Sequence, residues 1–376
     1  MEFRDLKRQY EYVKKDMDLR MREVIGRADF IQGEQVAELE RRLAAYVGAK
    51  HCVACANGTD ALQLALMAWG VGEGDAVFVP DFTFFSSGEV ASAVKAEPVF
   101  VDVEPDTYNM DCAALEAMAR RVAREGRLRP KAVVAVDLFG QPADHGRIRE
   151  IAKRYGMLVL EDAAQGFGGR IGERRAGSFG DISATSFFPA KPLGCYGDGG
   201  AVFTDNGEWA ELIRSYCVHG RGASKYDNVR IGMNSRLDTL QAAVLLAKLP
   251  VFCEKELGWA QAAAGKYTER LGGAATPPFV REGFHSSWAQ YTIRLSCKEE
   301  RDGLQAHLKG LGIPSAVYYQ KPMHRQEAFW GNGYDDRDYP VTNSLTRTVL
   351  SLPFHPYMEE GEIALVADAV RGYLKG

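Results

Sequence analysis

The chain has 376 residues, of which 46% are hydrophobic and 26% charged, and 46 Lys and Arg against 50 Asp and Glu give a net charge of -4. These proportions are typical of a soluble globular protein and exclude a disordered or fibrous chain. The charges form no basic stripe and no apolar run approaches the ~18 residues of a membrane span, so we expect neither a nucleic-acid nor a membrane partner. The first residues are charged rather than apolar, and we expect a cytoplasmic protein.

Short apolar or β-branched runs alternate with longer helical stretches between about residues 50 and 205, as in repeated strand–helix–strand units. The runs predict strands at residues 52–56, 76–79, 98–101, 132–136, 157–160, 182–188 and 201–204. Helices are expected between them at residues 60–69, 85–94, 111–124 and 145–155. Strands that are buried on both faces are nearly continuous apolar runs, so we expect a mostly parallel sheet.

The pattern changes after residue 205. A helix is predicted at residues 209–218, and a long helical segment begins near residue 237 and passes residue 259. Then come an apolar run at 289–295, a helix at 301–311 and a closing helix at 359–373, which together indicate a small α+β unit. We therefore predict a large domain of residues 1–245 and a small domain of residues 246–376.

The seven cysteines are scattered, as expected in a reducing compartment. Cys52 and Cys55 have the spacing of a redox or zinc pair, but positions three apart in a strand face opposite sides. We interpret them as buried cysteines. No phosphate-loop or dinucleotide-binding glycine motif occurs, and the histidines show no metal-binding spacing, so no metal is expected.

Three segments carry residues suited to chemistry. A predicted strand is followed by Asn57-Gly58-Thr59-Asp60 and a helix, which makes either a phosphate cradle at a helix N-terminus or an ordinary turn with a Thr cap. Another strand ends in Glu161-Asp162, where a carboxylate could pair with a protonated heterocycle nitrogen or simply be solvated. Lys191 lies in a Pro-bounded loop; lysine forms Schiff bases with carbonyl cofactors, although most lysines only cover surfaces.

These segments occur in order with Phe82-Thr83-Phe84, Ser186-Phe-Phe-Pro-Ala-Lys191 and Asn234-Ser-Arg-Leu-Asp238. Together they resemble the DegT/DnrJ/StrS family of pyridoxal-phosphate-dependent sugar-nucleotide aminotransferases, over essentially the whole chain. The resemblance implies an α/β aspartate-aminotransferase-like fold of type I, with a mostly parallel central sheet between helices and a smaller C-terminal α+β domain. It also implies pyridoxal 5'-phosphate as the cofactor.

The resemblance assigns roles to individual residues. Lys191 matches the Schiff-base lysine and Asp162 the aspartate on the pyridine nitrogen. The phosphate ligands of the family match Gly58, Thr59 and Ser186, with Asp60 beside them. The partner of the ring hydroxyl matches Gln165, and the aromatic residue that stacks on the ring matches Phe84. Asn234 matches an asparagine that reaches the cofactor phosphate of the neighbouring subunit, which implies a homodimer with shared active sites.

Within the family, the segments at residues 186–200 and 234–243 are most similar to enzymes that aminate UDP-2-acetamido-2-deoxy-3-oxo-glucuronate with L-glutamate for surface polysaccharide, including lipopolysaccharide O-antigen. The implied substrate-binding residues are Arg236, Tyr318, Tyr319 and His324. Arginine suits a carboxylated sugar because its planar fork pairs with carboxylate.

Two departures leave alternatives open. Tyr318 replaces a frequent histidine, and Phe84-Phe85-Ser86-Ser87 replaces the more usual aromatic-Val-Ala-Thr. Another UDP- or dTDP-linked 3-keto or 4-keto sugar is therefore an alternative substrate. A non-transaminating dehydratase or a regulator is a further alternative, against which Lys191 and Asp162 argue.

Overall fold

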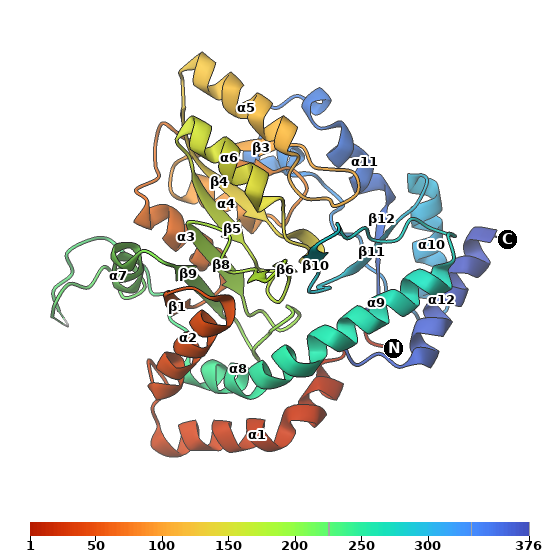
Figure 1. Ribbon diagram of the computed structural model, residues 1–376, viewed down its shortest axis with the longest axis horizontal. Helices are drawn as coiled ribbons and strands as arrows, with labels where there is room; N and C mark the ends of the chain where they lie inside the picture. Colours follow the sequence, from red (N-terminus) through yellow and green to blue (C-terminus); the bar gives the residue numbers. More distant parts are fainter. Residues whose placement is uncertain (225, 332, 376) are drawn as a thin grey trace.

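The computed structural model describes residues 1–224, 226–331 and 333–375. At its centre is a seven-stranded sheet in the spatial order β1-β9-β8-β5-β4-β2-β3 (Figure 1). Its strands are β1 (His51–Cys55), β2 (Asp75–Pro80), β3 (Glu97–Val101), β4 (Arg129–Val136), β5 (Leu158–Asp162), β8 (Ile182–Ser186) and β9 (Gly200–Thr204). The pairs from β3 to β8 are parallel and only β9 pairs antiparallel with its neighbours, so the predicted mostly parallel sheet is confirmed.

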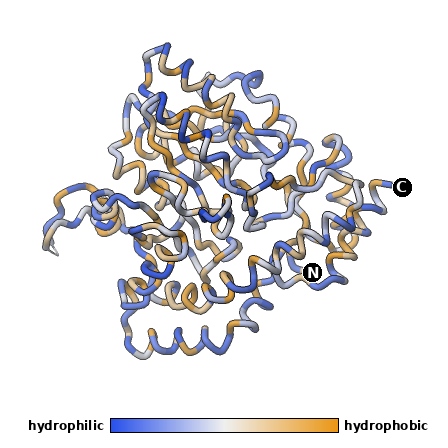
Figure 2. The backbone as a smooth tube through the Cα atoms, viewed as in Figure 1, coloured by the Kyte–Doolittle hydropathy of each residue, from blue (hydrophilic) through white to orange (hydrophobic). Residues whose placement is uncertain are grey.

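Alternate strand residues face the helices on opposite sides of the sheet. On β4, Val133 and Ala135 pack with α5 (Cys112–Glu125) and α6 (His145–Tyr155), whereas Val134 lies in the core formed with α3 (Gly58–Ala68), α4 (Ser86–Ala93) and α7 (Gly207–Tyr216). Figure 2 shows apolar segments concentrated around this sheet. The two-sided burial explains why the strands are continuous apolar runs.

Cys52 and Cys55 fall into different apolar clusters, on the two faces of β1. Both are buried, and all seven cysteines are free. The interpretation of this pair as separate buried cysteines is confirmed.

Two helices precede the sheet, α1 (Leu6–Arg27) and α2 (Glu34–Val47), and both pack on α8 (Thr239–Val251). A π-helical turn, Phe252–Glu256, joins α8 to α9 (Leu257–Leu271), so the long predicted helix is three consecutive pieces. No helix in the described ranges is long and apolar enough to cross a membrane.

The C-terminal part has its own apolar core, to which α9, β11 (Tyr291–Arg294), β12 (Val349–Leu352), α10 (Lys298–Gly310) and α12 (Glu360–Lys375) contribute. Helix α11 (Pro340–Thr348) and the short helical turns Met323–Arg325, Glu327–Phe329 and Asp336–Asp338 lead into β12. A small sheet of β10 (Phe284–His285), β6 (Arg170–Ile171) and β7 (Arg174–Arg175) lies apart. The division after residue 245 stays a prediction. One apolar cluster on the central sheet extends to Phe252 and the C-terminal cluster begins at Ala260, but another cluster on the sheet also includes residues from Met323 to Val349.

Candidate active site

The start of α3 touches the end of β8 at the carboxyl edge of the sheet, where open α/β folds bind ligands. A Cβ on Gly58 would lie 2.7 Å from Cβ of Ser186, so only glycine allows this approach. Asn57 Oδ1 accepts a hydrogen bond from the N–H of Asp60 (2.8 Å), which makes Asn57, not Thr59, the cap. The N–H groups of Gly58 and Thr59 belong to the first helical turn and have no intrahelical acceptor, so they are available to an anion.

The hydroxyl of Thr59 lies 2.7 Å from the hydroxyl of Ser86. This contact orients Thr59 beside Gly58 and Ser186. The structure thus brings three of the predicted phosphate ligands together, with Asp60 one residue further along the helix.

Asp162 is the last residue of β5 and is buried. Its Oδ2 accepts a hydrogen bond from Ser87 Oγ (2.8 Å), and its Oδ1 accepts one from the N–H of Ala164 (3.1 Å). Ser87 Oγ is itself 3.1 Å from Thr83 Oγ1. Burial raises the pKa of the Asp162 carboxyl, while Ser87, Ala164 and the Lys191 ammonium act in the opposite direction and favour the anion.

Lys191 follows β8 in a loop in which its N–H donates to the carbonyl of Phe188 (2.8 Å). Burial lowers the pKa of the Lys191 ammonium; Asp162 raises it and Arg4 lowers it further. A lysine in this environment is a better nucleophile and proton carrier than a solvated one.

Glu161, one residue before Asp162, faces the other side of β5 and is fully buried. Its carboxylate accepts hydrogen bonds from the N–H groups of Gly177 and Phe179 (2.7 Å each) and from Ser183 Oγ (2.6 Å). The two carboxylates at this strand end therefore have different environments, and Asp162 is the one coupled to the lysine.

A buried cluster of Asp137, His145 and Glu161 lies behind Asp162, with potential ligand atoms within 4.8 Å of one another. Nε2 of His145 is 2.8 Å from Oδ1 of Asp137. Burial raises the pKa of Asp137 well above its usual range and that of Glu161 to about 7, and it lowers the pKa of His145 to about 4. Burial thus favours the neutral form of each of these three groups, and none of them was predicted as a site residue. The histidine spacing could not indicate it, because its members come from three separate segments.

Gln165 and Tyr319 form one wall of the site. Gln165 Nε2 donates to the hydroxyl of Tyr319 (3.1 Å), and its Oε1 accepts from the N–H of Phe139 (2.9 Å). The ring of Phe84 is 54% exposed and its centroid lies 6.4 Å from that of Tyr319. A predicted cofactor-stacking ring and a predicted substrate residue are thus adjacent.

The other predicted substrate residues are placed differently. Tyr318 packs edge-on against Phe3, with centroids 6.4 Å apart. His324 is buried, with its ring nitrogens 2.7 Å from the carboxylates of Asp81 and Asp336. Because both nitrogens are occupied, the geometry does not support direct substrate binding by His324.

Asn234 is exposed, and the next residue, Ser235, accepts a hydrogen bond from the N–H of Ala56 (3.1 Å) just before the phosphate cradle. Arg236 lines a separate hollow of about 290 Å³ with Arg214 and other residues. Within one chain, Asn234 and Arg236 therefore belong to a surface segment rather than to the wall that carries Tyr319.

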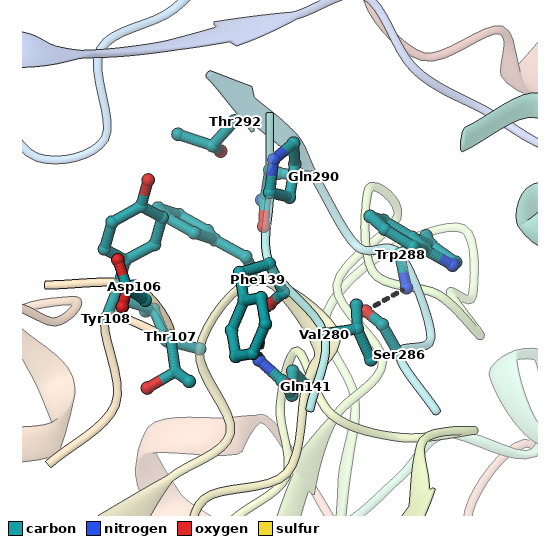
Figure 3. A pocket seen from close by; sticks show the side chains of 13 residues that line it. Asp106, Thr107, Tyr108, Phe139, Gln141, Val280, Ser286, Trp288, Gln290 and Thr292 are labelled. Atoms are coloured by element: carbon teal, nitrogen blue, oxygen red, sulfur yellow. Dashed lines mark hydrogen bonds between the residues drawn. The ribbon is translucent and has the colours of Figure 1, made fainter. Parts of the chain in front are cut away.

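A small cavity of about 20 Å³ lies beyond Phe139, between Tyr108, Gln141 and Trp288 (Figure 3). It has room for about one water molecule. None of the predicted site residues lines it, and it is too small for a sugar.

Ser86 and Ser87 contact predicted site residues but were not themselves predicted from the sequence. They occupy the positions noted as a departure from the family pattern, and their hydroxyls contact Thr59 and Asp162 respectively. The departure from the family pattern at these positions was the one sequence feature that could have indicated them.

The residues at this edge fit pyridoxal phosphate. Free helix N–H groups suit its phosphate, the buried carboxylate of Asp162 suits its pyridine nitrogen, and the half-buried Lys191 amine suits its aldehyde. The fold and the site define the class of lysine-dependent, pyridoxal-phosphate α/β enzymes.

The chain belongs to the DegT/DnrJ/EryC1/StrS aminotransferase family, whose model matches residues 11–371. It is 44% identical to the UDP-2-acetamido-2-deoxy-3-oxo-D-glucuronate aminotransferase of Pseudomonas aeruginosa over 98% of this chain and 99% of that protein. A DegT DnrJ EryC1 StrS aminotransferase from Brucella abortus matches it with a TM-score of 0.96 and 47% identity, covering 100% of both chains. The Bacillus subtilis protein ntda, solved with bound cofactor PMP, matches with a TM-score of 0.85 and 27% identity over 97% of this chain and 82% of its own.

The protein is therefore a pyridoxal-phosphate-dependent sugar-nucleotide aminotransferase. The predictions of family, fold class, enzyme class and cofactor are confirmed.

Proposed function

We propose that this enzyme transfers the amino group of L-glutamate to UDP-2-acetamido-2-deoxy-3-oxo-glucuronate, in the cytoplasm, for surface polysaccharide of the O-antigen type. The observation that supports the chemistry is the placement of the half-buried Lys191 near the buried Asp162 at the carboxyl edge of the sheet, where each shifts the pKa of the other. The sugar is proposed from the relative that acts on it, at 44% identity.

When bound, pyridoxal phosphate supplies an electron sink for the carbon that loses its proton. Asp162 holds a proton on the pyridine nitrogen, and Ser87 and Ala164 keep its carboxylate ionised. Lys191 Nζ would attach the cofactor and, once released, would carry the proton between the donor carbon and the cofactor, and by the reverse steps between the cofactor and the sugar carbon. Its lowered pKa increases the neutral fraction of the amine near neutral pH.

Other side chains orient the cofactor. The N–H groups of Gly58 and Thr59 and the hydroxyls of Thr59 and Ser186 would hold the phosphate, Phe84 would stack on the ring and Gln165 would bind the ring hydroxyl. A fixed ring places the reacting carbon within reach of Lys191.

Arg236 is the proposed ligand of the sugar carboxylate, because a guanidinium forms two parallel hydrogen bonds to a carboxylate. Tyr318 and Tyr319 are proposed to contact the rest of the sugar nucleotide. The carboxylate preference separates this substrate from neutral UDP- or dTDP-linked keto sugars. The dehydratase and regulator alternatives gain no support from this geometry.

We also propose a homodimer in which Asn234 and Arg236 act in the partner's site. The segment after α7 projects from the body (Figure 1), and Ile231 and Val229 on it are 90% and 54% exposed. Neighbouring exposed apolar side chains are typical of a protein interface. Since Asn234 and Arg236 are two residues apart, a dimer that brings Asn234 to the active site of the second copy also brings Arg236 close to it.

The substrate assignment is tested by supplying the 3-keto sugar through its preceding dehydrogenase, in the presence of L-glutamate, and measuring the amino sugar by mass spectrometry. We expect product with the carboxylated sugar, and a strong loss in Arg236→Met that Arg236→Lys partly restores. Equal amination of a neutral UDP-linked 3-keto sugar would overturn the assignment.

A further inference from the structure

Two cations, the half-buried Arg4 and the buried Lys248, hold the main chain of the loop that carries Lys191. Arg4 Nη2 donates to the carbonyl of Lys191 itself (2.9 Å) and to that of Pro192 (3.4 Å). Lys248 Nζ, from α8, donates to the carbonyl of Gly194 (2.7 Å). Arg4, from the N-terminal segment, thus fixes the loop at Lys191, and Lys248, from α8, fixes it three residues later at Gly194.

Glu256 is the anion of this arrangement. It is 2% exposed and ends the π-helical turn between α8 and α9, a feature frequent at functional sites. Its Oε1 accepts hydrogen bonds from Gln9 Nε2 (2.8 Å) and Tyr357 Oη (2.6 Å). Burial lowers the pKa of both Arg4 and Lys248, and Glu256 opposes this for each. The Glu256 carboxylate therefore favours the charged forms of both loop anchors and offsets part of the effect of their burial.

The segment that carries Arg4 is itself tied to the C-terminal part. The N–H of Phe354 donates to the carbonyl of Phe3 (3.0 Å), and the Phe3 ring packs against Tyr318. Arg4 therefore lies between the lysine loop and a segment that contacts Tyr318, one of the proposed substrate-binding residues.

We propose that Arg4 is a positioning residue for Lys191, which holds the lysine carbonyl so that the amine projects towards Asp162 and the cofactor. The inference rests on the proposed role of Lys191. A guanidinium suits this task because its planar group fixes the direction of the Nη2 hydrogen bonds to both carbonyls, whereas a lysine ammonium is a flexible point charge.

Arg4 also acts on the charge of the lysine. The charged groups that influence the Lys191 amine are Asp162, from β5, and Arg4, from the N-terminal segment. Without Arg4, Asp162 acts alone, and the pH at which the amine becomes neutral moves upward.

The test measures attachment of pyridoxal phosphate to the apoprotein, by stopped-flow absorbance as a function of pH, for Arg4→Met and Arg4→Lys. We expect Arg4→Met to slow attachment at neutral pH by about tenfold, the factor for one lost charge-assisted hydrogen bond. The pH dependence of the attachment rate should move to higher pH in Arg4→Met. Arg4→Lys keeps the positive charge, so its pH dependence should match that of the wild type while its attachment rate is lower.

Arg8→Met is the matched control. Arg8 lies on the same N-terminal segment but donates to Glu362 (2.7 and 2.9 Å) and to the main-chain carbonyl of Tyr357 (3.1 Å), and it contacts no residue of the lysine loop among the hydrogen bonds of the described chain. It should attach cofactor as the wild type does. If Arg4→Met does not fold, Glu256→Gln tests the same network and should slow attachment in the same direction as Arg4→Lys.

Borohydride reduction and peptide mapping separate the two ways of failing. Cofactor trapped on another lysine in the wild type would overturn the role of Lys191 and this inference with it. Cofactor trapped on Lys191, with wild-type attachment rate and pH profile in folded Arg4→Met, would overturn the inference alone.

Discussion

Replacing Ser87 with alanine tests how Asp162 is kept ionised. Ser87 Oγ donates to Asp162 Oδ2 at 2.8 Å and both residues are buried, so water does not readily replace the lost bond. A hydrogen bond to a charged group contributes about 1.5–3 kcal/mol and one pKa unit corresponds to about 1.4 kcal/mol, so the pKa of Asp162 should rise by about one to two units. Burial already raises this pKa, and the substitution acts in the same direction.

The assay is the pH dependence of the glutamate half-reaction, followed by the absorbance of the bound cofactor. Protonated Asp162 no longer supports a protonated pyridine nitrogen, so the acid limb should move to higher pH by that amount. Ser86→Ala is the matched control, because the Ser86 hydroxyl contacts Thr59 and not Asp162. An acid limb at the wild-type position in folded, cofactor-loaded Ser87→Ala would refute the reasoning.

Three further predictions follow from single contacts. Gly58→Ala places a Cβ 2.7 Å from the Cβ of Ser186, and the resulting overpacking should cost about 1–3 kcal/mol. We expect the variant to bind pyridoxal phosphate roughly tenfold more weakly in an absorbance titration. Binding of the cofactor with wild-type affinity would contradict the proposed phosphate cradle. Burial lowers the pKa of His355 from 6.5 to about 4, so its neutral form contributes stability above pH 6.5 that is lost as the pH falls towards 4. The free energy of unfolding of the wild type, measured by thermal unfolding, should therefore fall more steeply between pH 6.5 and 4 than that of His355→Asn, by up to about 3 kcal/mol. Parallel pH curves for the two proteins would argue against this. Arg236→Met should raise KM for the carboxylated sugar without slowing the glutamate half-reaction, and an unchanged KM would exclude Arg236 as the carboxylate ligand.

The central sheet was predictable because its strands are buried on both faces and so form continuous apolar runs. Helices α1 and α2 were not predicted. Only Gln9, Val13, Met17 and Val24 of the 22 residues of α1 are buried, which leaves a sparse apolar stripe that a sequence pattern hardly indicates. The small β10-β6-β7 sheet was missed as well, since its strands have two residues each.

The site was predictable where its residues belong to short motifs next to strand ends, as Gly58, Asp162 and Lys191 do. It was not predictable where the contact joins distant segments. Ser87 is 75 residues from Asp162, and Arg4 is 187 residues from Lys191, so only the fold brings them together. The substrate role of His324 was implied by the family resemblance, which does not indicate that the carboxylates of Asp81 and Asp336 contact its ring nitrogens.

The visible spectrum of the protein reconstituted with pyridoxal phosphate, before and after addition of L-glutamate without any sugar, tests the central claim most directly. We predict that the wild type shows the absorbance of lysine-attached cofactor and loses it to the pyridoxamine form with glutamate, whereas Lys191→Ala shows no such attached form. Attachment and conversion in Lys191→Ala, or a wild-type spectrum that glutamate does not change, would contradict the account.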